Sequence, residues 1–119
     1  MNEQLWTLEF YRDQRGRSPV ENFLDEQSPG MQAKILTNLR LLEALGLRLG
    51  MPLARPVAGQ GIWELRTQAS GNISRVFYFA VSGRRIVLLH GFIKKTQQTP
   101  RSEIATAIRR RDEYIGRIS

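Results

Sequence analysis

The sequence predicts a small α+β domain, with helices packed on one face of a mostly antiparallel sheet. Three observations favour this fold class: a length of 119 residues, apolar residues at helical spacing between positions 18 and 46, and three strand-like segments separated by short turns between positions 62 and 93. A typical domain holds roughly 100 to 200 residues. Residues 1–119 are therefore expected to form one domain.

The first expected element is a strand at Leu5–Arg12, with the sequence LWTLEFYR. Trp6, Leu8 and Phe10 alternate with more polar residues, and a period of two with one apolar side is typical of a half-buried strand. The QRGR that follows breaks the alternation, so the strand is expected to end there.

Two helices are expected next, with almost no loop between them. Ser18 is the N-cap of the first, Pro19 is its first residue, and Glu21 completes a capping box. Ser28 begins a second Ser-Pro pair. Apolar residues then recur at helical spacing until Gly46, a C-cap residue: Met31, Ile35, Leu39, Leu42 and Leu45. Because the connection is so short, the two helices must fold back as a hairpin.

A three-stranded antiparallel meander is expected after this hairpin. Residues Leu47–Gly61 include two prolines and show no periodicity, so they predict a connecting loop. The strands follow at Ile62–Gln68, Ile73–Val81 and Arg85–Ile93, and the short turns between them favour antiparallel pairing.

The last expected element is a C-terminal helix. Thr99 caps it and Pro100 begins it. Its apolar stripe holds Ile104, Ile108 and Ile115. The arginines of this helix lie mostly off that stripe: Arg109, Arg110 and Arg117.

The composition excludes several classes of protein. No apolar run approaches the roughly 20 residues that span a bilayer, and the N-terminus lacks the basic-then-apolar order of a signal peptide. We therefore expect a cytoplasmic protein that does not bind membranes. Because the chain has no cysteine and a single histidine, a structural zinc site is not expected. We also expect no other metal site and no small-molecule cofactor.

Positive charge is concentrated in the last third of the chain. The net charge is +7 overall; residues 84–119 carry nine basic and three acidic residues, or +6, and residues 1–83 carry nine and eight, or +1. Such a basic segment indicates either a binding site for a polyanion such as a nucleic acid or a solubilising helix face, and both interpretations stay open.

His90 lies at the end of the last predicted strand, just before Lys94 and Lys95. A histidine that titrates near neutral pH can take or give a proton, and fixed cations can stabilise charge on a phosphate during RNA cleavage. The strand alternation, however, puts His90 on the same side as Leu88 and Phe92, where it would be a packed residue. His90 is thus either a catalytic group or a structural one. The two adjacent lysines are expected to point to opposite sides.

Arg75 is expected on the same side of its strand as Phe77, where an unpaired guanidinium would be costly. It therefore needs an anion, which is either a substrate phosphate or a carboxylate, Glu64 or Glu9. Glu64 and Arg66 lie two residues apart on the polar side of the preceding strand. They form either an acid/base group beside a phosphate clamp or a cross-strand ion pair.

Four blocks carry a resemblance to a known family: GIWELR at 61–66, SRVFYF at 74–79, LLHGFIKKTQQTP at 88–100 and EIATAIRR at 103–110. In these blocks the chain resembles the RelE/ParE superfamily of bacterial toxins, and more closely its phage-derived, HigB-like branch. The resemblance implies a microbial-RNase-like fold and the toxin of a type II toxin-antitoxin system.

Many relatives of this kind cleave mRNA on the ribosome without a metal ion and are neutralised by a helix-turn-helix antitoxin. The resemblance therefore implies a ribosome-dependent mRNA endoribonuclease whose partners are the ribosome, mRNA and a cognate antitoxin. The ParE arm of the superfamily instead inhibits DNA gyrase, and a non-toxic, phage-derived nucleic-acid-binding regulator is a third interpretation.

The resemblance also assigns residues. Arg66 and Arg75 match basic positions on the second and third strands of RelE-type toxins, and with His90 and Lys95 they form the expected catalytic set. The residues expected to bind substrate phosphates are Lys94, Arg109 and Arg110. The chain departs from the family pattern at Glu64, where relatives often have a lysine, and at Ala105, near the position of their C-terminal tyrosine. His90 with one of the two lysines, or alternatively Tyr78, would have to stand in for the missing groups.

Overall fold

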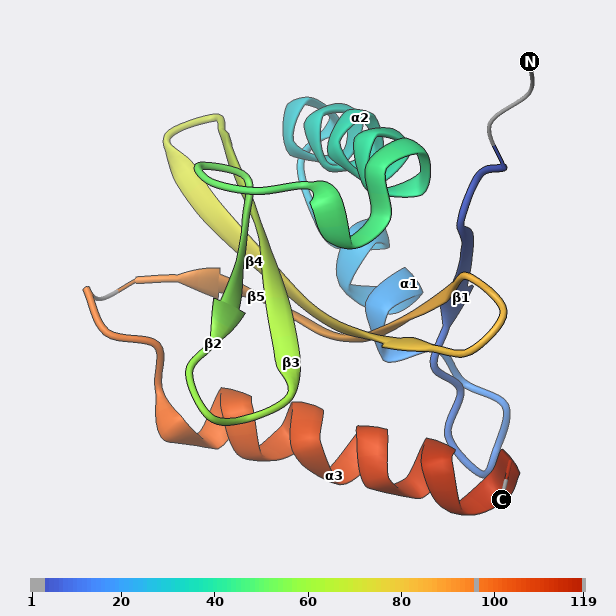
Figure 1. Cartoon of the computed structure of the whole chain (residues 1–119). Coiled ribbons are helices and arrows are strands. Elements are labelled where there is room, and N and C mark those ends of the chain that lie inside the picture. The colour runs from blue at the N-terminus through green and yellow to red at the C-terminus, as the bar shows by residue number, and fades with distance from the viewer. Residues whose placement is uncertain (1–3, 96, 119) are drawn as a thin grey trace.

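A computed structural model describes residues 4–95 and 97–118 of the chain. Figure 1 shows one sheet with helices on both of its faces. The elements follow in the order β1 (Thr7–Phe10), α1 (Pro19–Asp25), α2 (Pro29–Leu45), the 3-10 turn η1 (Gly46–Arg48), β2 (Ala54–Val57), β3 (Ile62–Ala69), β4 (Asn72–Val81), β5 (Arg85–Lys94) and α3 (Arg101–Ile118). The predicted α+β class is confirmed.

The five strands lie in the order β1-β5-β4-β3-β2. The antiparallel meander expected for the three long strands is present as β3, β4 and β5. The N-terminal strand β1 pairs in parallel with β5, with Thr7 opposite Arg85 and Phe10 opposite Leu88. The first and last thirds of the chain therefore meet at one edge of the sheet.

The other edge is formed by β2, which pairs antiparallel with β3. The prediction of a simple loop over Leu47–Gly61 is wrong at this point. The strand is only four residues long and contains Pro56, which has no backbone N–H to donate. An edge strand tolerates such a residue because one side of it needs no partner, and so it leaves no alternating pattern in the sequence.

The predicted starts of the first two helices are confirmed, whereas α3 begins at Arg101, one residue after the predicted Pro100. The Ser18 side chain accepts a hydrogen bond from the backbone N–H of Glu21, and Ser28 does the same for Met31, both at 3.2 Å. The second helix ends at Leu45, followed by Gly46 with φ of +57°. Both helices lie on the same face of the sheet (Figure 1), but α1 packs mainly on β5 and α2 on β3, so the helices do not pack against each other as the expected hairpin.

The sheet has a core on each face, so the expectation that all helices share one face is wrong. One core lies under α1 and α2 and includes Val20, Phe23, Ile35, Leu42, Leu65 and Tyr78. The other lies under α3 and includes Tyr11, Phe77, Phe79, Leu89, Ala107 and Tyr114. Tyr114, rather than the exposed Ile115, buries the C-terminal end of α3. Both faces of β4 are covered for most of its length.

A β-bulge in β5 changes which side His90 faces. Phe77 pairs with His90, but the next residue, Tyr78, pairs with Leu88, so Leu89 is an extra residue in the ladder. Because a bulge reverses the alternation beyond it, His90 lies on the α3 face while Leu88 lies on the α1 and α2 face. The prediction that these two residues share a side is wrong.

Among the described residues, no helix is long and apolar enough to cross a membrane.

Candidate functional site

Five charged residues gather on the α3 face of the sheet. The register puts Arg55 of β2 opposite Glu64 of β3, and Arg66 of β3 opposite Arg75 of β4. Lys94 at the end of β5 pairs with Ile73, two residues from Arg75. We call these residues the basic cluster: Arg55, Glu64, Arg66, Arg75 and Lys94. It holds four cations around one carboxylate, and thus a charge of +3.

Glu64 lies at the centre of the basic cluster and is 2% exposed. Its Oε1 accepts hydrogen bonds from Arg55 Nε at 2.6 Å and from Arg75 Nη1 at 3.1 Å. Within the described part of the chain its Oε2 makes no hydrogen bond. The predicted ion pair between Arg75 and Glu64 is therefore present, whereas Glu9 accepts its hydrogen bonds from the Tyr114 hydroxyl.

Arg75 is 6% exposed, and its Nε is buried without a hydrogen-bond partner among the described residues. Burial lowers the pKa of this guanidinium, Glu64 opposes that shift, and the neighbouring Arg55 and Arg66 add to it. A buried N–H without an acceptor is costly. An anion that accepted this hydrogen bond would relieve both the missing bond and the repulsion among the cations.

Two hollows flank the Glu64–Arg75 ion pair. The larger, about 480 Å³, is lined by Ile73, Arg75, Lys94, Lys95 and Gln97. The smaller, about 250 Å³, is lined by Arg55, Pro56, Val57, Ala58, Glu64 and Thr99. Because β5 ends at Lys94, the two lysines are not held on opposite sides of a strand, and both line the larger hollow.

Lys94 lines the larger hollow, and Arg66 lies opposite Arg75 on the neighbouring strand. Partial burial lowers the pKa of Lys94, and Arg75 lowers it further. Arg66 is half-buried and donates to Gln68 at 3.2 Å. No group of three or more histidine, cysteine or acidic side chains in the described ranges is placed to hold a metal ion. The chemistry that this arrangement suits is binding of a phosphate by fixed cations.

His90 lies under the N-terminal half of α3, where it joins that helix to β5. Its Nε2 is 2.6 Å from Glu103 Oε1, and its Nδ1 is 3.0 Å from Arg110 Nη1. Arg110 also donates to the Leu89 carbonyl at 3.0 Å. Because a guanidinium can only donate, Nδ1 is the acceptor, and Nε2 carries the proton and donates it to Glu103.

The structure thus divides the predicted site residues into separate groups. Glu64, Arg66, Arg75, Lys94 and Lys95 lie around the larger hollow or beside it. His90 on β5 and Arg110 on α3 contact each other between the sheet and the helix. None of their side-chain hydrogen bonds joins them to the basic cluster or to Lys95. Arg109 is exposed and lines a different groove, between α3 and the turn that joins β2 to β3.

The structure also locates two further residues that bear on the site, Tyr78 and Arg55. Tyr78 is fully buried on the opposite face of β4 from Arg75, and burial raises its pKa to about 12. Arg55 contacts Glu64 but had no signal in the sequence, because β2 was expected to be a loop. Only the strand pairing shows that this arginine belongs to the basic cluster.

His90 gives a testable dependence of stability on pH. Burial lowers the pKa of His90 below its ordinary value of 6.5; Glu103 opposes the shift, and Arg110 and Arg109 add to it. The unfolded chain therefore binds the proton more readily, so the free energy of unfolding should fall as pH drops below about 6.5. Urea denaturation at pH 7.5 and 5.0 measures this fall.

The matched control is His90→Gln, which keeps one donor and one acceptor but does not titrate. His90 is the only histidine of the chain, so the wild type should lose more stability between the two pH values than this variant. Equal losses would show that His90 does not control the dependence.

A family model described as Phage derived protein Gp49-like (DUF891) matches residues 22–112 of the chain. The matched span contains the whole basic cluster, His90 and most of α3. No curated protein matches the chain significantly.

Proposed function

The chain belongs to the Gp49-like family of phage-derived proteins, and we propose that it is the toxin of a type II toxin-antitoxin system. The proposed activity is metal-independent cleavage of mRNA on the ribosome, as in the HigB-like branch of the RelE/ParE superfamily. The observation that carries this proposal is Arg75, a nearly buried guanidinium with an unpartnered Nε, beside a hollow lined by two lysines.

The basic cluster supports a phosphate of single-stranded RNA as the ligand. Arg75 Nε can donate to a non-bridging phosphate oxygen, and Lys94 and Lys95 add fixed positive charge around it. During cleavage the negative charge on these oxygens increases, and preorganised cations stabilise it. The hollows on either side of the ion pair give room for the nucleotides on each side of that phosphate.

The reaction can be written with the residues of the basic cluster. Glu64 Oε2 accepts the proton of the ribose 2′-hydroxyl, whose oxygen then attacks phosphorus. The bond from phosphorus to the 5′-oxygen breaks, and that oxygen leaves with the electron pair and takes a proton from Lys94. The products are a 2′,3′-cyclic phosphate and a free 5′-hydroxyl. The lowered pKa of Lys94 favours this proton transfer.

His90 is assigned a different role from the catalytic one expected from the sequence. Both of its ring nitrogens are engaged by α3, through Glu103 and Arg110. We therefore propose that it positions α3 against the sheet. The His90→Gln variant should keep both contacts and so keep activity, whereas a catalytic histidine could not be replaced in this way.

The expected partners are proposed on the same basis. The +3 charge of the basic cluster suits the backbone of mRNA held by the ribosome. We therefore propose that the protein acts in the cytoplasm. A cognate helix-turn-helix antitoxin would neutralise the toxin by covering this cluster with an acidic segment, because opposite charges steer such contacts.

Translation in a purified ribosomal system, followed by primer extension on the mRNA, tests the proposal. Cuts should appear only when ribosomes are present, because the ribosome positions the RNA for attack. Free mRNA incubated with the protein is the control. The His90→Gln variant should give the same cuts as the wild type.

Two results would contradict the proposal. Translation that continues with intact mRNA would exclude ribosome-dependent cleavage. Growth arrest with intact mRNA and inhibited gyrase supercoiling would favour an inhibitor of the ParE kind instead.

A further inference from the structure

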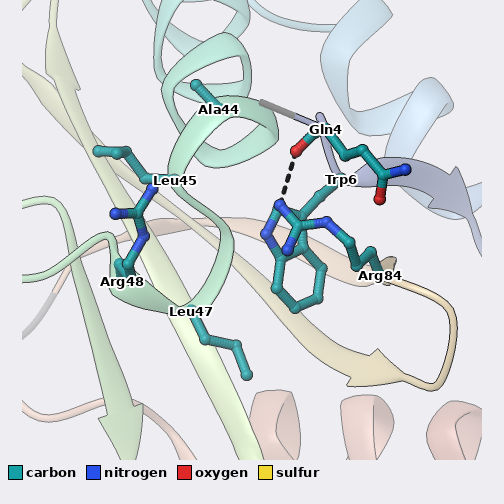
Figure 2. Close-up of a pocket in the computed structure, with 7 residues that line it drawn as sticks. All are labelled: Gln4, Trp6, Ala44, Leu45, Leu47, Arg48 and Arg84. Carbon is teal, nitrogen blue, oxygen red and sulfur yellow. Dashed lines mark hydrogen bonds between the residues drawn. The ribbon is translucent and has the colours of Figure 1, made fainter. Parts of the chain in front are cut away.

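Another pocket lies on the α1 and α2 side of the molecule, away from the basic cluster. Its volume is about 400 Å³, and it is formed by the start of the chain, the end of α2 with η1, and the turn between β4 and β5 (Figure 2). Trp6, Arg48 and Arg84 line it together with Leu45 and Leu47. Neither the sequence motifs nor the proposed function accounts for this pocket.

Trp6 is held in place before any ligand binds. Its backbone N–H donates to the Glu43 carbonyl at 2.8 Å. Gly46, with φ of +57°, lies directly against the indole, where a Cβ atom would overlap the ring. Position 46 therefore requires glycine for two reasons: its φ is positive, and Trp6 leaves no room for a Cβ atom.

Arg84 covers the Trp6 ring. Its Cζ atom is 4.9 Å from the ring centroid, and its Nη2 donates to the Gln4 carbonyl at 2.6 Å. A guanidinium has five N–H donors, so this contact leaves donors on Arg84 for a ligand. Trp6 and Arg84 together form a preformed aromatic–guanidinium stack on one wall of the pocket.

Arg48 stands on the opposite side of the pocket from Trp6 (Figure 2). It is exposed, and its side chain makes no hydrogen bond or ion pair with the part of the chain that the structure describes. None of the described residues that line the pocket is acidic. The pocket therefore carries two arginines that no lining carboxylate neutralises, and it favours an anion.

The remaining wall indicates that the anion has an apolar, planar part. Leu45 and Leu47 line the pocket beside the arginines. A bare phosphate would use the arginines but leave the leucines and the aromatic stack without a partner. A nucleotide offers both parts, because its base stacks on aromatic rings and guanidinium planes while its phosphate binds arginine.

We propose that this pocket binds one unpaired nucleotide of a single-stranded RNA. The phosphate lies between Arg48 and Arg84, and the base packs against the Trp6–Arg84 stack and the two leucines. This site goes beyond the proposed cleavage activity, because it lies on the other side of the sheet and needs none of the residues of the basic cluster. It gives the protein a second contact with RNA.

Tryptophan fluorescence tests the site directly. The chain has two tryptophans, so a Trp63→Phe background leaves Trp6 as the only source of the signal. The probe is a 2′-O-methyl hexa-adenylate, which cannot be cleaved through its 2′-hydroxyl. Binding should change the Trp6 fluorescence and saturate.

Arg48→Gln should weaken this binding about tenfold, since a hydrogen bond to a charged group is lost. It should also reduce the slope of log affinity against log salt by about 0.7, the value for one phosphate contact on a single strand. Arg15→Gln removes the same charge from an exposed residue elsewhere and should leave both quantities unchanged.

Three further outcomes decide the proposal. Adenosine monophosphate should bind more tightly than inorganic phosphate; equal binding would overturn the assignment to a nucleotide. Arg75→Lys, which keeps the charge beside Glu64, should leave the Trp6 signal unchanged; a loss as large as that of Arg48→Gln would place the binding at the basic cluster. The absence of any fluorescence change would also overturn the proposal, whether or not the protein cleaves RNA.

Discussion

Arg75→Lys is expected to reduce RNA cleavage on the ribosome by about 100- to 1,000-fold, the range seen when one preorganised donor to a developing oxyanion is removed. Lysine keeps a positive charge near Glu64, but it lacks the Nε donor that is unpartnered in the structure. It also lacks the planar fork with which arginine binds a phosphate. The rate of cutting in single-turnover primer extension measures the effect.

The matched control for this prediction is Arg117→Lys, the same change at an exposed residue near the C-terminal end of α3. It should cut at the wild-type rate. Circular dichroism should show that both variants remain folded. An Arg75→Lys protein that cuts within about threefold of the wild type would exclude Arg75 as the phosphate-binding group, even if the protein is a ribonuclease.

The helix caps and long strands that the sequence predicted depend on residues close together in the chain. Ser18 and Ser28 accept the hydrogen bonds expected of N-caps, because a cap depends only on residues within one turn of the helix. The long strands β3, β4 and β5 are likewise marked by residues on their own segment. The alternation in β3 predicted that Glu64 and Arg66 share a side, and the register confirms it.

Strand pairing explains what the sequence could not predict. A bulge depends on how two strands fit together, so the sequence of β5 alone gave no sign that Leu89 is the extra residue. That single residue moves His90 from the α1 and α2 face to the α3 face. There it meets Glu103 and Arg110 from a helix that lies 13 and 20 residues further along the chain.

The sequence predicted only part of the basic cluster, because the rest depends on strand pairing and side-chain geometry. The sequence indicated that Arg75 needs an anion and named Glu64 as a candidate, because burial of an unpaired charge is costly wherever it occurs. It could not indicate Arg55, whose strand has no pattern, nor the unpartnered Nε, which depends on side-chain geometry. The Trp6 pocket also joins residues from three distant segments.

Glu64→Leu is expected to destabilise the protein by about 3–5 kcal/mol, the cost of leaving one member of a buried ion pair without its partner. Glu64 is 2% exposed and Arg75 6% exposed, so water cannot replace the lost contact at Arg75. The Arg55 side chain is 48% exposed and can turn into solvent, so it should add little to the loss. Urea denaturation monitored by circular dichroism measures the change.

The double variant Glu64→Leu with Arg75→Met separates stability from function. Removing both charges leaves no uncompensated ion, and replacing a buried ion pair by apolar residues of similar volume is often neutral or stabilising. The double variant should therefore recover most of the stability lost in Glu64→Leu and still fail to cleave RNA. Recovery of cleavage together with stability would mean that the pair serves only to hold the sheet together. A single variant as stable as the wild type would mean that Arg75 finds another anion in the folded protein.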